Sequence, residues 1–344
     1  MIKYDKQKSL YIKKFFTAQR VKIFFNMDRN LALDFVRATE AAAISSAFWV
    51  GKGNEHQADQ AAVEAMRKAF SVIDMDGTIV IGEGERDEAP MLYIGEKVGS
   101  GKGMKLDIAI DPLEGTTITA RGDPNAMSVF AAAPHGGLLN APDTYMDKIA
   151  AGPKCVGVID LDASVEDNIK AVAEKLDKDI AEVTVMILER DRHKDLIERV
   201  RKCGCRIRLI RDGDIAGALA PAIRESGVDL LVGTGGAPEG VIAAVALKCF
   251  GGEIQGRLNF RNEHEKERAK NMGLKDISQK LMMKDLVKSD EAMFAATGVT
   301  DGTILKGVRF TSHGAVTHSI VMRAKTKTVR FIEAHHHFEH FPEY

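Results

Sequence analysis

Acidic residues follow two predicted strands that lie near each other in the chain, and their placement suggests chemistry. Residues 78–81 and 108–110 are short apolar runs rich in β-branched side chains, which predicts two buried strands. Glu83 follows the first strand, Asp111 closes the second, and Glu114 comes three residues later. Ligands of open α/β sheets gather where strands end, so we expect these carboxylates to share one site.

The residues after the second predicted strand, DPLEGTT, combine cation ligands with a phosphate seat. Pro112 removes a ladder donor and should end the strand, which leaves Glu114 close enough to Asp111 to share a cation. Gly115 and Thr116 then open the next segment, where free backbone N–H groups and a hydroxyl can bind phosphate. Carboxylate oxygens beside an anion seat suit Mg²⁺ or Mn²⁺. Acids on soluble proteins are more often solvated, but these end apolar strands.

Length and composition exclude several classes of protein. A chain of 344 residues is long enough for two packed lobes or one large layered domain. No apolar run approaches a membrane span, and a net charge of −1 offers no general basic field for nucleic acid. The four cysteines occur without a secretory signal, so we expect free structural thiols and a cytoplasmic protein.

The remaining pattern predicts an α/β protein. An amphipathic helix should begin at Asp28, a second near residue 57, and a buried strand should span 126–133. From residue 156 strands and helices alternate, which indicates a second lobe. The predicted elements of this lobe are strands 156–160, 183–188, 206–210 and 228–233 and helices 165–176, 196–202 and 215–223. Further strands should run from Phe294 through residues 321–332.

The acidic segments resemble a known family. DPLEGTT resembles the D-P-[ILV]-[DE]-G-T signature of the lithium-sensitive, metal-dependent sugar phosphatases. IGEGERDEAPMLYIGEKVG ahead of it and GGAPEG at 235–240 narrow the resemblance to class II fructose-1,6-bisphosphatase, over about residues 27–330. The resemblance implies a layered αβαβα sandwich of two packed lobes. It also implies hydrolysis of the 1-phosphate of fructose 1,6-bisphosphate in gluconeogenesis, by direct attack of water.

The resemblance also implies roles for particular residues. Two or three Mn²⁺ or Mg²⁺ ions should be held by Asp59, Glu83, Asp111, Glu114 and Glu239. Thr116 should orient the attacking water, and Asp87 is the candidate proton acceptor. The sugar bisphosphate should contact Glu114, Gly115, Thr116, Tyr145, Arg190, Asp191, Arg192, Asp212, Gly213, Asp214 and Gly236. The family commonly has proline where Asp191 stands, which weakens the assignment at that position.

Arginines and carboxylates follow the predicted strands of the second lobe, and both residue types suit a phosphorylated sugar. Arginine forks bind phosphate in a bidentate manner, and carboxylates accept hydrogen bonds from sugar hydroxyls. Residues 233–240 lack the nucleotide P-loop pattern, and a glycine pair after a strand is only a weak dinucleotide signal. Pro238 suits the first turn of a helix, which places Glu239 at a helix start.

The chain should consist of two lobes between two terminal segments. We expect a metal and phosphate lobe at 27–155, a sugar-binding lobe with the C-terminal strands at 156–332, and a homodimer or homotetramer. Residues 1–26 are basic and aromatic; a dispensable extension is favoured over a presequence or a membrane-surface segment. The histidine-rich segment 333–344 should be an untied tail without function. Alternative activities are a sedoheptulose 1,7-bisphosphatase, an inositol-phosphate phosphatase, which the position of the single Trp49 disfavours, and a sugar-phosphate-binding regulator.

Overall fold

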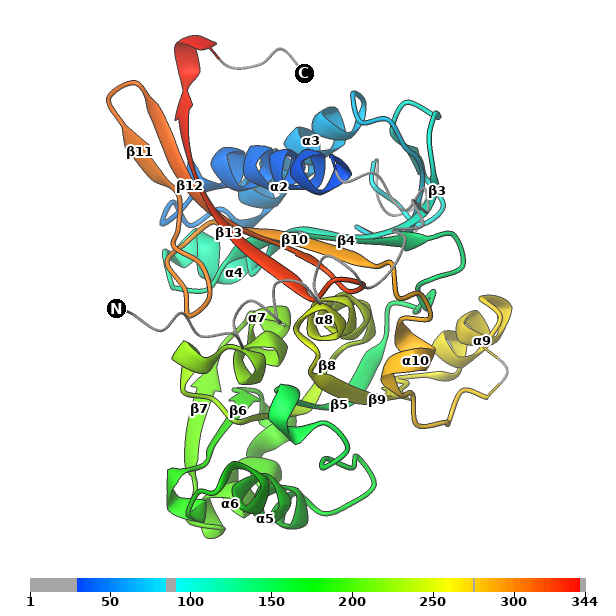
Figure 1. The fold of residues 1–344 in the computed structure, drawn as a ribbon, viewed down its shortest axis with the longest axis vertical. Helices are drawn as coiled ribbons and strands as arrows, with labels where there is room; N and C mark the ends of the chain where they lie inside the picture. The colour runs from blue at the N-terminus through cyan, green and yellow to red at the C-terminus, as the bar shows by residue number, and fades with distance from the viewer. Residues whose placement is uncertain (1–29, 85–90, 275, 341–344) are drawn as a thin grey trace, which may run out of the picture.

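The computed structural model describes residues 30–84, 91–274 and 276–340, which form five layers (Figure 1). Helices α2 and α3 cover one face of a large sheet, α7 and α8 separate this sheet from a smaller one, and α5 and α6 cover the far face of the smaller sheet. These helices are α2 (Leu31–Ala47), α3 (Glu55–Phe70), α5 (Val165–Leu176), α6 (Lys194–Lys202), α7 (Asp214–Leu219) and α8 (Ala237–Phe250). The αβαβα sandwich expected from the sequence is therefore confirmed.

Among the described residues the larger sheet has eight strands. Seven follow the order β11-β12-β10-β4-β3-β1-β2, and β13 pairs with β12 along its whole length. Its strands are β1 (Asp76–Ile81), β2 (Lys97–Val98), β3 (Lys105–Glu114), β4 (Met127–Pro134), β10 (Met293–Gly298), β11 (Arg309–Thr311), β12 (Gly314–Arg323) and β13 (Thr328–His337). β1 and β3 are parallel neighbours, with Ile79 opposite Ile108. Their carboxyl ends therefore lie side by side, as the acidic pattern required.

The smaller sheet, as far as the structure describes the chain, has five strands in the order β7-β6-β8-β5-β9. Its strands are β5 (Tyr145–Ala151), β6 (Thr184–Leu188), β7 (Arg206–Ile210), β8 (Leu230–Gly236) and β9 (Glu253–Asn259). β6 is parallel to β7 and β8, whereas β5 runs antiparallel to β8 and β9. The start of β5 therefore lies beside the carboxyl ends of β6, β7 and β8.

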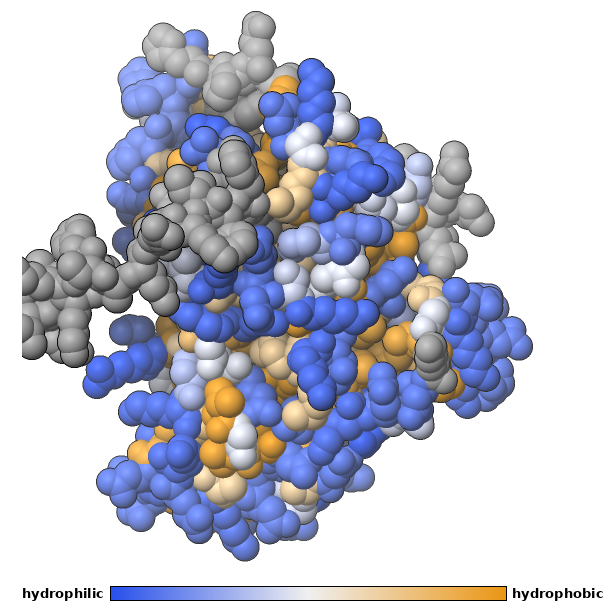
Figure 2. Space-filling view, turned by 45° about the vertical axis from the view of Figure 1, so that its right-hand side comes forward, coloured by the Kyte–Doolittle hydropathy of each residue, from blue (hydrophilic) through white to orange (hydrophobic). Residues whose placement is uncertain are grey.

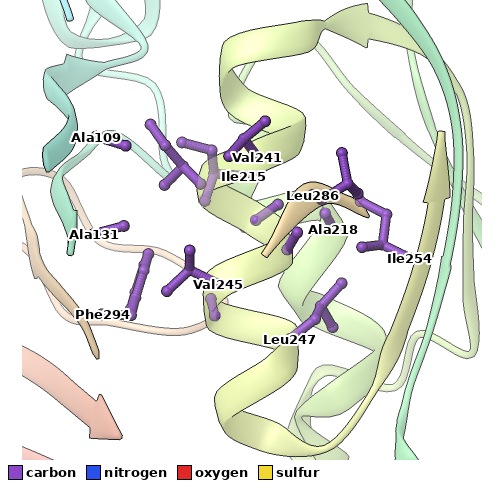
Figure 3. Packing of buried hydrophobic residues seen from close by; sticks show 14 of the residues in the cluster. Ala109, Ala131, Ile215, Ala218, Val241, Val245, Leu247, Ile254, Leu286 and Phe294 are labelled. Carbon is purple, nitrogen blue, oxygen red and sulfur yellow. The ribbon is translucent and has the colours of Figure 1, made fainter. Parts of the chain in front are cut away.

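Helix α8 is apolar on all sides because it is buried between the two sheets (Figure 3). Val241 and Val245 of α8 lie near Ala109, Ala131 and Phe294 of the large sheet. On its other side the same core includes Leu247, Ile254 and Leu286, which come from α8, β9 and α10 (Met283–Leu286). Each fully buried aliphatic side chain contributes about 1.5–3 kcal/mol, so this core fixes the distance between the sheets.

The smaller sheet corrects two sequence predictions. Residues 156–160 do not form a strand, since Gly157 has a left-handed φ of 76° and Val156 is 51% exposed. Instead Tyr145, in a segment where no strand was predicted, begins β5, which lies between β8 and β9. The sequence did not predict this strand because it contains Asp147 and Lys148, and two charged residues in succession are unusual in the middle of a sheet. Lys148 is nevertheless fully buried, and its partners are described below.

The larger sheet corrects three further predictions. β3 does not end at Pro112 but continues to Glu114 through a register shift against β4 between Asp111 and Glu114, and a bulge tolerates a proline. Strands β10 to β13 pair into this sheet through β4, so the C-terminal strands belong with the first lobe and not with the sugar-binding lobe. The segment from Glu333 is not an untied tail, because β13 pairs with β12 as far as His337.

The other helices are short or peripheral. α4 (Thr116–Arg121) follows β3, while α9 (Glu263–Asn271) lies beyond β9, and the predicted helix over 215–223 is α-helical only to Leu219. The predicted N-cap Asp28 lies outside the described residues; Asn30 precedes α2. The face drawn in Figure 2 is largely hydrophilic, with smaller hydrophobic patches among the polar residues. No helix among the described residues has the length and apolar character needed to cross a bilayer.

Candidate active site

A cavity of about 260 Å³ opens where the ends of β1 and β3 meet the start of α8. Four acids line it: Glu83 after β1, Asp111 in β3, Asp143 before β5 and Glu239 in the first turn of α8. The first two come from one sheet, and the last two border the other. The layer of helices between the sheets therefore brings together acids that are more than one hundred residues apart in the chain.

The acids around this cavity repel one another. Burial, reinforced by the charge of Asp59 in α3, raises the pKa of Glu83 to about 8. Burial also raises the pKa of Asp111 well above its usual range, and Glu83 and Glu239 are the largest of the neighbouring charges that add to this. The pKa of Asp59 is raised mainly by burial. A protein gains no stability from such a cluster, which is the pattern of groups kept for function.

At this site, two buried carboxylate oxygens have no hydrogen-bond partner among the described residues. Glu114 accepts a hydrogen bond from the backbone N–H of Ile215 through Oε1, but its Oε2 is unpaired. The Oε2 of Glu239 is also buried and unpaired. Burial raises the pKa of both carboxyl groups. An unsatisfied buried acceptor costs about 1–3 kcal/mol, so each of these oxygens indicates a missing positive partner.

Gly236 makes the room that the Glu239 carboxylate occupies. A Cβ built on Gly236 would lie 1.7 Å from Oε2 of Glu239, so no larger residue fits while the carboxylate keeps this position. Pro238 occupies the first turn of α8, as the sequence predicted. The GGAPEG segment thus contains both the start of α8 and the glycine that leaves space for the Glu239 carboxylate. A Cβ on Gly235 would in turn overlap the carboxylate of Asp214, so each of the two glycines before the helix makes room for a different acid.

The donor set fits divalent cations. Asp59, Glu83, Asp111, Glu114 and Glu239 offer only carboxylate oxygens, the ligands that Mg²⁺ and Mn²⁺ prefer. In the described part of the chain, however, no three His, Cys, Asp or Glu side chains already stand close enough together to hold one ion. Repulsion between like charges accounts for that separation, and the unpaired oxygens of Glu114 and Glu239 show where positive charge is lacking.

The predicted phosphate seat lies directly after β3. Gly115 adopts a left-handed conformation with φ 90° and ψ 55°, which a glycine adopts without strain. Thr116 is the first residue of α4 and is half-buried. Thr119 donates its hydroxyl hydrogen to the carbonyl oxygen of Gly115 at 2.8 Å, which fixes the turn. Gly115 and Thr116, the predicted phosphate-binding residues, therefore form a turn directly after Glu114.

In the second lobe, Arg192 and Tyr145 form one group. The Arg192 guanidinium lies 4.6 Å from the centre of the Tyr145 ring and donates two hydrogen bonds to the carbonyl oxygen of Thr234, at 3.1 and 2.8 Å. Arg261, which the sequence did not suggest, lies 5.1 Å from the same ring centre. Two guanidinium groups beside one aromatic ring create a positive surface at the start of β5.

Of the other sequence-predicted residues of this lobe, some lie together at the start of α7 and others make contacts elsewhere. Asp212, Gly213 and Asp214 lie together where α7 begins, and burial raises the pKa of Asp212. Arg190 instead donates to the backbone carbonyl oxygens of Arg211 and Glu189. The side chain of Asp191 is 94% exposed and pairs with Lys194 at 2.9 Å, so the structure does not bring it to the other candidates. Asp87 lies outside the described residues.

Lys148 is the main site residue that the sequence did not reveal. Its Nζ donates to Oδ2 of Asp214 and, at 2.7 Å, to the carbonyl oxygen of Gly236, and its side chain is only 2% exposed. Its charge also lowers the pKa of Glu239 against the effect of burial. Lys148 therefore joins the start of α7 to the start of α8. Only a predicted strand over residues 145–151 could have indicated a buried lysine, and the sequence pattern predicted none there.

His193 holds the loop that carries Arg192. Its Nδ1 lies 2.7 Å from the carbonyl oxygen of Leu188, and its Nε2 accepts the backbone N–H of Thr234 at 2.8 Å. These partners define the neutral tautomer with hydrogen on Nδ1, and burial lowers the pKa of the ring. His193 thus connects the end of β6 to β8.

Comparison with known proteins agrees with this geometry. Residues 29–336 match the family model described as bacterial fructose-1,6-bisphosphatase, glpX-encoded. The chain is 44% identical over 326 residues to the class 2 fructose-1,6-bisphosphatase of Haemophilus influenzae, covering 91% of this chain and 98% of that protein. It is 43% identical over 334 residues to a Synechococcus protein named D-fructose 1,6-bisphosphatase class 2/sedoheptulose 1,7-bisphosphatase, covering 90% and 96%. The chain therefore belongs to the bacterial class 2 fructose-1,6-bisphosphatase family.

Proposed function

We propose that this protein hydrolyses fructose 1,6-bisphosphate to fructose 6-phosphate and phosphate, with divalent cations bound at the carboxylate cavity. The observation that carries the proposal is the cavity itself, where mutually repelling acids meet. Glu239, in its lining, has a buried, unpaired oxygen, and so does Glu114, three residues after Asp111. The family and the names of its relatives supply the reaction class.

In this proposal the acids hold the cations. The proposed ligands are Asp59, Glu83, Asp111, Glu114 and Glu239. When bound, Mg²⁺ or Mn²⁺ supplies neutralisation of the phosphoryl charge and activation of water, the demanding part of monoester hydrolysis. The acids contribute by keeping this charge in a partly closed cavity, where electrostatic interactions are stronger than in water.

The chain's own residues position the substrate. Gly115 and Thr116 bind the reacting phosphate and orient the attacking water, and no side chain serves as a covalent nucleophile. Asp87 is the proposed proton acceptor. Asp212, Asp214 and the Gly213 and Gly236 backbone contact the sugar, and Lys148 holds the start of α7 against the start of α8.

The distal phosphate is proposed to bind at Tyr145 and Arg192. The guanidinium of Arg192 is already oriented by Thr234 and by the Tyr145 ring, so little conformational freedom is lost on binding. Arg190, the second arginine expected here, is directed toward Arg211, and Arg261 is better placed to share the charge. Asp191 has no contact with the substrate in this proposal, because its side chain is exposed and pairs with Lys194.

A second substrate is favoured by one comparison. The Synechococcus relative carries the name of a fructose 1,6- and sedoheptulose 1,7-bisphosphatase. We therefore propose sedoheptulose 1,7-bisphosphate as an additional substrate, since both sugars place phosphates at the two ends of a ketose chain. A homodimer or homotetramer in the cytoplasm is part of the same proposal.

The test is phosphate release from purified protein with Mn²⁺ or Mg²⁺. The substrates are fructose 1,6-bisphosphate, sedoheptulose 1,7-bisphosphate and an inositol monophosphate. We expect the highest kcat/KM for a ketose bisphosphate and loss of activity on chelation that added metal restores. Preference for the inositol phosphate would favour the related inositol phosphatases, and binding of the bisphosphate without turnover would favour a regulatory protein.

A further inference from the structure

A second cavity, of about 560 Å³, lies at the end of the smaller sheet opposite the candidate active site. Tyr145 and Gly236 mark the active-site end, whereas this cavity is lined by Gly152 after β5 and by Val228 and Asp229 before β8. Pro221 and Ile223, which follow α7, line another wall. Its volume falls within the range of about 300–1,000 Å³ typical of small-molecule sites.

The cavity combines an apolar wall with unneutralised positive charge. Its apolar residues include Pro153, Leu176 and Pro221. Lys178 pairs with Asp229 at 2.6 Å, and Asp229 also accepts the backbone N–H of Thr184, so that acid is already neutralised. Lys154 and Arg224 also line the cavity, and neither side chain has a hydrogen-bond or ion-pair partner among the described residues. The net charge available to a ligand is therefore positive.

The cavity contains no catalytic constellation. Cys155 is its only nucleophilic side chain within the described residues, and it is buried with a pKa raised by burial, which keeps the thiol protonated. The single acid is held by Lys178. The arrangement suits a ligand that is bound and released unchanged.

Two elements run directly from this cavity to the candidate active site. β5 carries Lys148 and reaches the cavity at Gly152, while α7 begins at Asp214 and continues into the turn at Pro221. The two elements touch at the cavity, since a Cβ on Gly152 would lie 2.2 Å from the carbonyl oxygen of Pro221. At the other end they are joined by the ion pair between Lys148 and Asp214.

We propose that this cavity, which we call the remote pocket, binds a small organic anion that regulates the active site. The ligand class is a compound with one phosphate or carboxylate group on a compact apolar body. Lys154 and Arg224 contact the anionic group, and the walls from Pro153, Leu176 and Pro221 contact the body. Binding at the junction of β5 and α7 shifts these elements, which carry Lys148 and Asp214. A ligand changes activity only by binding two arrangements of these elements unequally.

The binding test uses phenylphosphonate, whose carbon–phosphorus bond a phosphatase does not hydrolyse, and benzoate for the carboxylate class. Isothermal titration of the full chain is compared with the Lys154→Ala/Arg224→Ala variant. A matched control, Lys170→Ala/Arg201→Ala, removes two exposed charges from α5 and α6 in the same lobe. We expect at least about 10-fold weaker binding in the pocket variant and unchanged binding in the control. Equal affinity in both variants, or no binding by either probe, overturns the proposal.

The regulatory part rests on the proposed function and is tested separately, at saturating fructose 1,6-bisphosphate. A ligand that competes at the active site leaves kcat unchanged under these conditions, whereas a remote-pocket ligand changes it. We expect a change of at least about 5-fold, absent from the Lys154→Ala/Arg224→Ala variant. Binding without any change in kcat or KM overturns the regulatory role. If the protein does not hydrolyse this substrate, the binding test still decides whether the pocket exists.

Discussion

Replacing Lys148 by methionine tests whether one buried cation holds the two helix starts together. Methionine keeps most of the side-chain volume and removes the charge. The Lys148 side chain is 2% exposed and that of its partner Asp214 is 11% exposed, so the carboxylate would be left nearly buried without its cation. Breaking a buried pair from one side costs about 3–5 kcal/mol.

The expected effect of Lys148→Met depends on pH. Lys148 lowers the pKa of Glu239, so its removal raises that pKa further. A folded-state pKa above the unfolded value makes the variant lose stability as pH rises, because the unfolded chain then releases protons more readily. We expect the free energy of unfolding to fall by about 3–5 kcal/mol at pH 8 and by clearly less at pH 5.

Chemical denaturation of metal-free protein measures this effect. The matched control is Lys248→Met, since Lys248 is 14% exposed but its acid partner Asp290 is 87% exposed and can return to water. That pair should contribute no more than about 1 kcal/mol. The double variant Lys148→Met/Asp214→Asn should recover much of the loss. A loss below about 1 kcal/mol for Lys148→Met, equal at both pH values, would refute the reasoning.

Three further predictions concern other parts of the molecule. Arg192→Ala should lower kcat/KM for fructose 1,6-bisphosphate by about 10- to 150-fold and leave a small monophosphate nearly unaffected; equal loss on both would make Arg192 structural. Burial raises the pKa of Glu40 to about 7, so ionisation of this group should lower the free energy of unfolding by up to about 3 kcal/mol as pH rises from 4.5 to 7. Glu40→Gln should therefore gain stability relative to wild type over that interval, and parallel denaturation curves at pH 5 and pH 8 would contradict this. Gly236→Ala should displace the Glu239 carboxylate and weaken Mn²⁺ binding by at least about 10-fold with little change in Tm, as measured by titration calorimetry.

Much of the fold follows from local patterns. The predicted strands before Glu83 and Asp111 are short, apolar and β-branched, and helix 165–176 was predicted with the bounds that α5 has. β5 was missed because the stability of Lys148 in a strand comes from Asp214 and Gly236, which are distant in the sequence. The pairing of β10 with β4 is likewise long-range, so no local pattern assigns the C-terminal strands to the first sheet.

The candidate site was predictable to a similar degree. Residue type and strand position identified Asp111 and Glu114, and the resemblance added Asp59 and Glu239, which the structure places around one another. Arg261 was not predicted, because its contact with Tyr145 depends on the long-range pairing of β9 with β5, which places Asn259 opposite Tyr145. Lone charged residues acquire a role only when tertiary structure supplies their partners.

The most direct test of the central claim is to compare Asp111→Asn with wild type, with and without Mn²⁺. The claim is that Asp111 and its neighbouring acids repel one another in the free protein because they are kept for a cation. Without metal at pH 8, the variant should have a Tm no lower than that of wild type. Mn²⁺ at about 100 times its Kd should stabilise wild type by about 2.7 kcal/mol and the variant far less, while kcat falls at least about 10³-fold. Full activity of the variant, or equal stabilisation of both proteins by Mn²⁺, would contradict the claim.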